Sequence, residues 1–266
     1  MPRSRPPSNR LSDAQNAPSD ETWDLPVDSS TALSQMVRAS DLSVVFQPIV
    51  RLDTRQVHGY EALVRCRVPE FSNPVELFRH AVQKNCAGRL GRMIREIAVP
   101  MCAGKPLFVN VHPQELNESW LIRPDDPVFA HDHDLCIEIS ESVPMTHFDL
   151  CRSVLREVRD RSGAALAIDD LGAAYSDLKR IVDLEPQVLK LDRELIAGIH
   201  TSDRQQKLVR RLLELCANLG AYAIAEGVET PEEHRALVDC GVVFAQGYLY
   251  ARPAFPLPSA TFPARR

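Results

Sequence analysis

Short apolar runs of strand length alternate with segments of helical periodicity along most of this chain, and this alternation limits the folds open to it. The runs typical of strands lie at residues 44–50, 58–65, 107–112, 135–140, 165–170, 188–192, 221–226 and 244–249. Helical stripes lie between most of them, at residues 78–101, 148–161, 203–219 and 231–241. Repeated strand and helix units of this kind favour a mostly parallel sheet and fit a β-sandwich poorly.

The first two strands depart from this pattern. About seven residues, including Asp53 and Thr54, separate them, whereas a parallel crossover needs about a dozen or more. We therefore expect the first two strands to pair antiparallel. The helical crossovers that follow predict a closed α/β barrel of eight strands.

The composition is that of an ordinary globular protein, with 266 residues of which 44% are hydrophobic and 25% are charged. Residues 1–30 are rich in proline, serine and charged side chains and lack apolar periodicity, so we expect a flexible N-terminal tail there. The barrel is expected over residues 31–257, and residues 258–266 are expected to form a C-terminal tail. No attached sensor or cyclase domain is expected.

Charge and hydropathy argue against several kinds of partner. The formal net charge of -5 does not suit a surface for long nucleic acids or anionic membranes. No apolar run approaches the roughly 18 residues of a membrane span, and the N-terminus does not resemble a signal peptide. The seven cysteines contain no Cys-x-x-Cys pair and are expected to be reduced core thiols. We therefore predict a cytoplasmic protein without membrane insertion or a nucleic acid polymer as partner, and a homodimer is left open.

Two adjacent aspartates stand out from the strand pattern. Asp169 and Asp170 end an apolar run directly before Leu171 and Gly172. Adjacent like charges at the edge of a core repel unless a cation or hydrogen-bond donors compensate them, and hard carboxylate oxygens suit Mg²⁺ or Mn²⁺. The alternative is a helix N-cap, in which one aspartate caps the helix and the other is solvated.

Polar side chains recur near the carboxyl ends of the predicted strands, where barrels of this kind carry their sites. These residues are Glu61, Asn110, Glu138, Asp169, Asp170, Lys190, Glu226 and Gln246. So many carboxylates converging on one mouth would repel one another without divalent cations. The set predicts a metal site of oxygen ligands, with one ion or two, and hydrolysis of a phosphate ester as the natural reaction.

The same residues belong to an ordered series of motifs that resembles the EAL-domain family, the cyclic di-GMP phosphodiesterases. The resemblance extends over residues 42–253. The motifs are Gln47-Pro48-Ile49, Glu61-Ala62-Leu63-Val64-Arg65, Asn110, Glu138-Ile139-Ser140-Glu141, Asp169-Asp170-Leu171-Gly172, Lys190-Leu191-Asp192, Ala225-Glu226-Gly227-Val228-Glu229 and Gln246-Gly247-Tyr248.

The resemblance implies a modified TIM (β/α)8 barrel with an antiparallel first hairpin, and a centre of two Mg²⁺ or Mn²⁺ ions. The ligands of one ion would be Glu61, Asn110, Glu138 and Asp169. Asp169 would be shared between the ions, and Asp170 would bind the second one. The reaction that follows is the opening of one P–O bond of cyclic di-GMP to give linear pGpG.

The resemblance also assigns the residues around the metal centre. Lys190 would orient the attacking water or steady the phosphate, and Glu226 would assist as a base or water ligand beside the catalytic Glu61. The residues that would contact the substrate are Gln47, Arg65 on phosphate, Asp192, and Gln246 near the second ion. Glu141 and Glu229 would support loops rather than bind metal.

Three positions depart from the family pattern. Leu171 stands where phenylalanine is usual, Ala174 where glycine is usual, and His112 where a small hydroxyl residue is usual. His112 is interpreted either as a rim residue near the metal or as a packed histidine. His131 and His133 have a metal-like spacing, although a solvated loop is the other interpretation.

The sequence thus predicts a metal-dependent cyclic di-GMP phosphodiesterase. The alternatives are a catalytically weak or inactive cyclic di-GMP receptor that acts through a protein partner, and a barrel hydrolase for another phosphodiester. The resemblance favours the enzyme over the receptor, because such receptors typically lose metal ligands and this chain keeps them.

Overall fold

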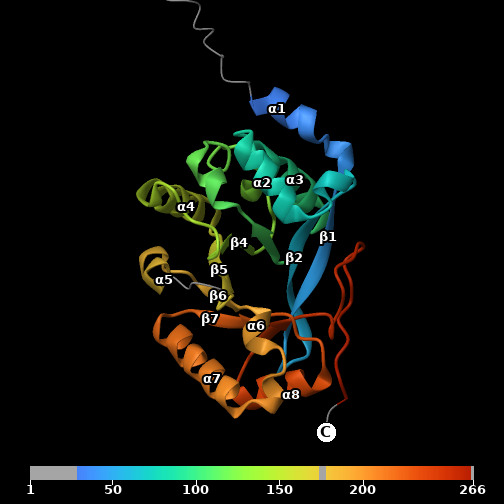
Figure 1. Cartoon of the computed structure of the whole chain (residues 1–266), viewed down its shortest axis with the longest axis vertical. Coiled ribbons are helices and arrows are strands. Elements are labelled where there is room, and N and C mark those ends of the chain that lie inside the picture. The colour runs from blue at the N-terminus through green and yellow to red at the C-terminus, as the bar shows by residue number, and fades with distance from the viewer. Residues whose placement is uncertain (1–28, 174–177, 265–266) are drawn as a thin grey trace, which may run out of the picture.

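The structure is a computed structural model, and it describes residues 29–173 and 178–264. Within them, eight strands form a closed barrel in chain order (Figure 1). The strands are β1 Leu42–Arg51, β2 Gln56–Cys66, β3 Leu107–Asn110, β4 Leu135–Ser140, β5 Ala165–Leu171, β6 Val188–Leu191, β7 Tyr222–Ala225 and β8 Phe244–Gln246. The predicted α/β barrel is confirmed.

Strand β1 runs antiparallel to both of its neighbours, β2 and β8, and the other adjacent pairs are parallel. The antiparallel hairpin agrees with the short connection between the first two strands. The register of β1 places Gln47 opposite Glu61 and Ile49 opposite Gln246. The reversed strand therefore brings residues from both ends of the barrel sequence to one mouth.

Helices cover the outside of the barrel, with α2 and α3 at one end of the molecule and α7 and α8 at the other (Figure 1). The helices are α1 Ser29–Met36, α2 Pro74–Gln83, α3 Ala87–Met101, α4 Phe148–Ser162, α5 Leu178–Leu184, α6 Arg193–Ile196, α7 Asp203–Asn218 and α8 Pro231–Cys240. The helical stripe at residues 78–101 therefore belongs to two helices. Asn85 lies between them with a left-handed φ of 52°, so the backbone turns although the apolar spacing continues.

The last strand is shorter than the run 244–249 suggests, because the chain turns after Gln246. A Cβ atom at Gly247 would lie 2.1 Å from the carbonyl oxygen of Val228, so only glycine fits this close approach. The Val228 N–H donates to the Gln246 carbonyl, and the Leu249 N–H donates to the Val228 carbonyl. These bonds replace the strand ladder and leave Gln246 at the rim.

The barrel interior has an apolar layer below the polar mouth. Its buried members are Ile49, Phe108, Cys136, Ala167, Val188 and Ile224. In five strands, the residue two positions after the member of this apolar layer is a polar residue of the mouth. Side chains two positions apart on a strand share a face, so both point into the barrel. All seven cysteines are free, and six of them are buried, as expected for core thiols.

Residues 253–264 lie against the barrel (Figure 1). Ala254 pairs with Phe46 of β1, and Leu257 and Phe262 pack against the core. Among the described residues, no helix has both the length and the apolar character needed to cross a membrane.

Candidate active site

The mouth of the barrel is organised around a buried lysine. Lys190 on β6 is fully buried, and its Nζ lies among four carboxylates from four other parts of the barrel. The distances are 3.4 Å to Glu61, 2.9 Å to Glu138, 3.3 Å to Asp169 and 2.8 Å to Glu226. One cation cannot balance four anions, so the cluster carries excess negative charge in a place where water screens it little.

This excess charge shifts the proton affinities of the acids. Burial raises the pKa of Glu138 well above the usual range of a glutamate, more than the Lys190 charge lowers it. Burial and repulsion from Asp169 do the same to the pKa of Glu226. Burial also lowers the pKa of Lys190, but the surrounding carboxylates outweigh it, so the ammonium stays charged. The cluster therefore attracts protons or cations.

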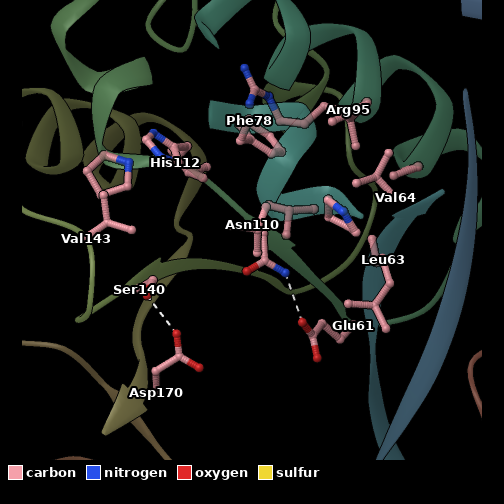
Figure 2. Close-up of a pocket in the computed structure, with 18 of the residues that line it drawn as sticks. Glu61, Leu63, Val64, Phe78, Arg95, Asn110, His112, Ser140, Val143 and Asp170 are labelled. Atoms are coloured by element: carbon pink, nitrogen blue, oxygen red, sulfur yellow. Dashed lines mark hydrogen bonds between the residues drawn. The ribbon is translucent and has the colours of Figure 1, made fainter. Parts of the chain in front are cut away.

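Two amide side chains hold Glu61 in place. Asn110 Nδ2 donates to Glu61 Oε1 at 2.9 Å, as Figure 2 shows, and Gln246 Nε2 donates to Glu61 Oε2 at 2.6 Å. Gln246 Nε2 also donates to Gln47 Oε1 at 3.1 Å. Burial raises the pKa of Glu61, but the Lys190 charge and these donated bonds outweigh it and lower the pKa overall. Glu61 is thus held as a carboxylate.

The adjacent aspartates both reach the mouth because β5 is irregular. The pairing register with β6 shifts between Ile168 and Leu171, and Asp170 has a left-handed φ of 63°. The Asp170 N–H donates to Asp169 Oδ1 at 2.9 Å, and Ser140 Oγ donates to Asp170 Oδ2 at 2.7 Å. Both aspartates lie within the strand, so neither caps a helix.

Two groups of carboxylates have the spacing of metal ligands. They are Glu61 with Glu138 and Asp169, and Asp169 with Asp170 and Glu226, and within each group the ligand atoms lie within 4.8 Å of one another. Glu138 Oε2 is buried and accepts no hydrogen bond from residues 29–173 or 178–264. A buried acceptor of this kind fits a cation, so the residues present suit a divalent metal with oxygen ligands.

The remaining predicted residues lie around this centre. The Arg65 guanidinium donates to the Val64 carbonyl at 2.8 Å. Asp192 caps α6 by accepting from the Glu194 N–H at 2.7 Å. Glu229 forms an ion pair with Arg193.

Glu141 is buried beside Asp169, whose carbonyl accepts its N–H at 3.0 Å. The loop that Glu141 was predicted to support includes Ala174, which lies outside the described residues. Of the two histidines of the 131–134 loop, His133 is exposed and His131 is half-buried. His131 bonds to the Lys105 carbonyl and His133 to the Asp134 N–H, and neither belongs to a ligand group among the described residues.

Two cavities flank the acidic cluster. One, of about 390 Å³, extends from Glu61 and Asp170 towards Phe78 and His112 (Figure 2). The other, of about 270 Å³, is lined by Asp192, Glu226, Tyr248 and others. Glu61 borders both cavities, so a ligand with two similar halves could lie across the cluster.

Sequence reasoning missed two contributors to the site. Phe78 forms part of the larger cavity, but in the sequence it is one member of a helical stripe with no polar signal. Ser140 orients Asp170, and a hydroxyl at the end of a strand gives no sign of its partner. His112 gave a visible signal for this part of the cavity wall, as a departure from the family pattern.

Comparison with known proteins identifies the family. The EAL domain matches residues 30–253, and the chain belongs to this family. The resemblance predicted from the motifs is confirmed.

Particular relatives are similar over most of the chain. The cyclic di-GMP phosphodiesterase PA2567 of Pseudomonas aeruginosa is 29% identical over 256 residues, which cover 91% of this chain and 43% of that protein. BlrP1 of Klebsiella pneumoniae, solved with manganese and cyclic di-GMP, is 31% identical with a TM-score of 0.70 and covers 83% of this chain and 58% of that one. A standalone EAL protein of Vibrio cholerae O395, in its cyclic di-GMP-bound form, is 26% identical with a TM-score of 0.68 and covers 83% of this chain and 96% of that one. The chain spans less than half the length of the curated relatives it matches.

Proposed function

We propose that this chain is a metal-dependent phosphodiesterase that hydrolyses cyclic di-GMP to linear pGpG. The observation that carries this proposal is the complete ring of carboxylates around Lys190, with two metal-spaced groups that share Asp169. A protein that only binds the dinucleotide does not need such a costly concentration of buried negative charge. The relatives named as cyclic di-GMP phosphodiesterases support the choice of substrate.

The site fits Mg²⁺ or Mn²⁺, and the two ligand groups support two ions. The residues that would hold them are Glu61, Asn110, Glu138, Asp169 and Asp170, with Gln246 nearby. When bound, such ions supply a water of lowered pKa and neutralise charge on the phosphate. The buried Glu138 Oε2, which accepts no hydrogen bond from the described residues, supports this assignment.

The protein's own residues would position and protonate the reacting groups. The Lys190 ammonium is a fixed positive charge that can hold a water or phosphate oxygen and stabilise negative charge as it develops. Glu226 Oε1 lies 2.8 Å from it. Because burial raises the pKa of Glu226, its carboxylate is suited to take a proton from the attacking water and release it later.

The two cavities support a dinucleotide substrate. They lie on either side of the acidic cluster, so each could take one nucleoside while a phosphate lies over the carboxylates. Arg65 lines the larger cavity and would contact phosphate, while Gln47 and Asp192 line the smaller one and would contact the substrate there.

The experiment is incubation of the purified protein with cyclic di-GMP and Mg²⁺ or Mn²⁺, with products separated by chromatography. We expect pGpG with either metal and none after chelation. Replacement of Mg²⁺ by Ca²⁺ should block turnover, because its larger and looser coordination misplaces the water. Tight binding of cyclic di-GMP without turnover under either activating metal would favour the receptor. If the protein cleaves another phosphodiester and cyclic di-GMP does not inhibit that cleavage, the chain would instead be a barrel hydrolase for another phosphodiester.

A further inference from the structure

His112 forms part of the wall of the larger cavity, together with Phe78 of helix α2. The two rings are stacked, with centroids 5.5 Å apart and an angle of 7° between their planes. Figure 2 shows both side chains on the side of the cavity away from Asp170. Glu61, Asn110 and Asp170 of the acidic cluster line the same cavity, so a ligand anchored at the cluster can reach the rings.

The local backbone fixes the His112 ring. His112 is the N-cap of a short 3₁₀ helix, Pro113–Asn117, and its Nδ1 accepts from the Gln114 N–H at 3.2 Å. The His112 N–H donates in turn to Glu115 Oε1 at 2.9 Å. Glu115 is fully buried and accepts a hydrogen bond of 2.7 Å from the buried Arg95 of helix α3. The turn that carries the ring is therefore anchored to the helical layer.

This anchoring selects one tautomer of the ring. An Nδ1 atom that accepts a hydrogen bond carries no proton, so the proton of the neutral ring lies on Nε2. Nε2 makes no hydrogen bond with residues 29–173 or 178–264. The ring thus offers a donor of fixed identity at the cavity wall.

Most other polar groups on this wall are already engaged. Asn110 donates to Glu61, Ser140 donates to Asp170, and the Arg95 guanidinium binds Glu115 and Asp126. The rest of the lining is mainly apolar, with Val64, Ile94, Ala98, Val109 and Val111 among its residues. An apolar slot with a stacked aromatic wall and a donor of fixed identity on His112 suits a flat heteroaromatic ring that carries an acceptor.

We propose that His112 is a specificity-determining residue, whose Nε2–H donates to O6 of a guanine base held in the larger cavity. This inference rests on the proposed function, since it takes cyclic di-GMP as the ligand. Guanine presents the O6 acceptor where adenine presents the N6 amino donor. An adenine in the same position would set two donors against each other, so His112 favours cyclic di-GMP over cyclic di-AMP.

The test compares the two dinucleotides on variants of one residue. Dissociation constants are measured by calorimetry with Ca²⁺ in place of Mg²⁺, so that turnover does not consume the ligand. His112→Ser keeps a side-chain oxygen that can cap the turn but removes the ring and its donor. We expect it to weaken cyclic di-GMP binding about tenfold, the worth of one hydrogen bond at the upper end of its usual range. Cyclic di-AMP affinity should change by less than about twofold or improve, since no hydrogen bond to it is lost.

Three further measurements separate the donor from the stacking surface. Cyclic di-IMP retains O6 and should respond to His112→Ser as cyclic di-GMP does. His112→Phe keeps an aromatic ring without the donor, and it should lose the preference for guanine too. Phe78→Leu, the matched control, removes stacking area without removing a donor and should weaken both dinucleotides to a similar extent.

The outcomes distinguish this inference from the function on which it rests. If the wild type neither binds nor hydrolyses cyclic di-GMP, both are overturned. If the wild type hydrolyses cyclic di-GMP, while His112→Ser and His112→Phe keep the full preference over cyclic di-AMP, only the role of His112 is overturned. Melting curves of each variant show whether a change in affinity reflects loss of the fold.

Discussion

Lys190 lies at the point where four carboxylates meet, so its replacement measures how much this one positive charge contributes to catalysis. We expect Lys190→Ala to reduce kcat by about 100-fold or more, while the affinity for cyclic di-GMP falls much less, because a charge near the attacking water matters most as charge develops. Steady-state kinetics with Mg²⁺ and calorimetry with Ca²⁺ measure the two effects. Lys207→Ala, on the exposed surface of α7, is the control. Equal losses in affinity with an unchanged kcat would contradict this role.

The raised pKa values of Glu138 and Glu226 predict how pH and metal act together. Burial makes each folded carboxyl hold its proton to a higher pH than it would in the unfolded chain. The metal-free protein therefore keeps the full contribution of these carboxyls below their unfolded pKa values, and it loses stability as the pH rises from there through the raised folded pKa values. Metal binds the deprotonated acids, so the gain in Tm on adding Mg²⁺ should be larger at about pH 8 than at about pH 6.

Melting curves with chelator and with saturating Mg²⁺ at the two pH values test this prediction. Burial also raises the pKa of Glu115 to about 7, which gives the chelated protein a pH dependence of the same sign. The ion pair between Glu115 and Arg95 is not part of the proposed metal site. The difference in Tm between the chelated and the Mg²⁺-loaded protein at one pH therefore reflects the titration of the acidic cluster. A metal-induced gain in Tm that is equal or smaller at about pH 8 would show that protons and metal do not compete.

Among the elements, β5 is the one whose irregularity the site depends on. Its shifted register turns Asp169 and Asp170 to the same mouth, and the Ser140 hydroxyl from β4 holds Asp170. We expect Ser140→Ala to lower the apparent affinity for the activating metal, or the activity at limiting metal, by about 10-fold or more, as is usual for groups that orient metal ligands. Metal titration of the rate measures this loss. Ser153→Ala on the exposed face of α4 should leave the titration unchanged, and an equally unchanged Ser140→Ala curve would mean that Asp170 needs no such support.

The elements also show which parts of the site a sequence can reveal. An apolar run of strand length is a local signal, so Glu138 and Lys190 could be placed near the carboxyl ends of their strands from their apolar neighbours alone. The irregular β5 was not predicted, because the register shift depends on pairing with β6 rather than on the Asp169-Asp170 pair itself. Phe78 was not predicted as a wall residue either, since it meets His112 only in the folded chain. The break at Asn85 was not predicted, because the helical spacing of apolar residues in the 78–101 stripe resumes after it.

At the scale of the whole molecule, the C-terminal segment closes over the antiparallel side of the barrel. Phe262 packs on Tyr250 with ring centroids 5.6 Å apart, and the Arg55 guanidinium lies 4.9 Å from the Phe262 ring. Phe262 is only half-buried, so its truncation should cost about 1 kcal/mol and lower Tm by about 2–4 °C. We expect Phe262→Ala to show this shift with an unchanged kcat. Thermal melting and kinetics measure the two quantities, with the more exposed Phe255→Ala for comparison, and an unchanged Tm would mean that the segment adds nothing to stability.

Asp169 is central to the proposed metal centre, since among the described residues it is the one shared by both metal-spaced groups. The most direct measurement is the initial rate of pGpG formation from cyclic di-GMP by Asp169→Asn at saturating Mn²⁺, beside the wild type and the exposed control Asp239→Asn. We predict a loss of about 1,000-fold or more for Asp169→Asn, because a shared ligand lost from both groups removes several kcal/mol of charge stabilisation. The control should retain the wild-type rate. A folded Asp169→Asn protein that forms pGpG at the wild-type rate would contradict the proposed metal centre.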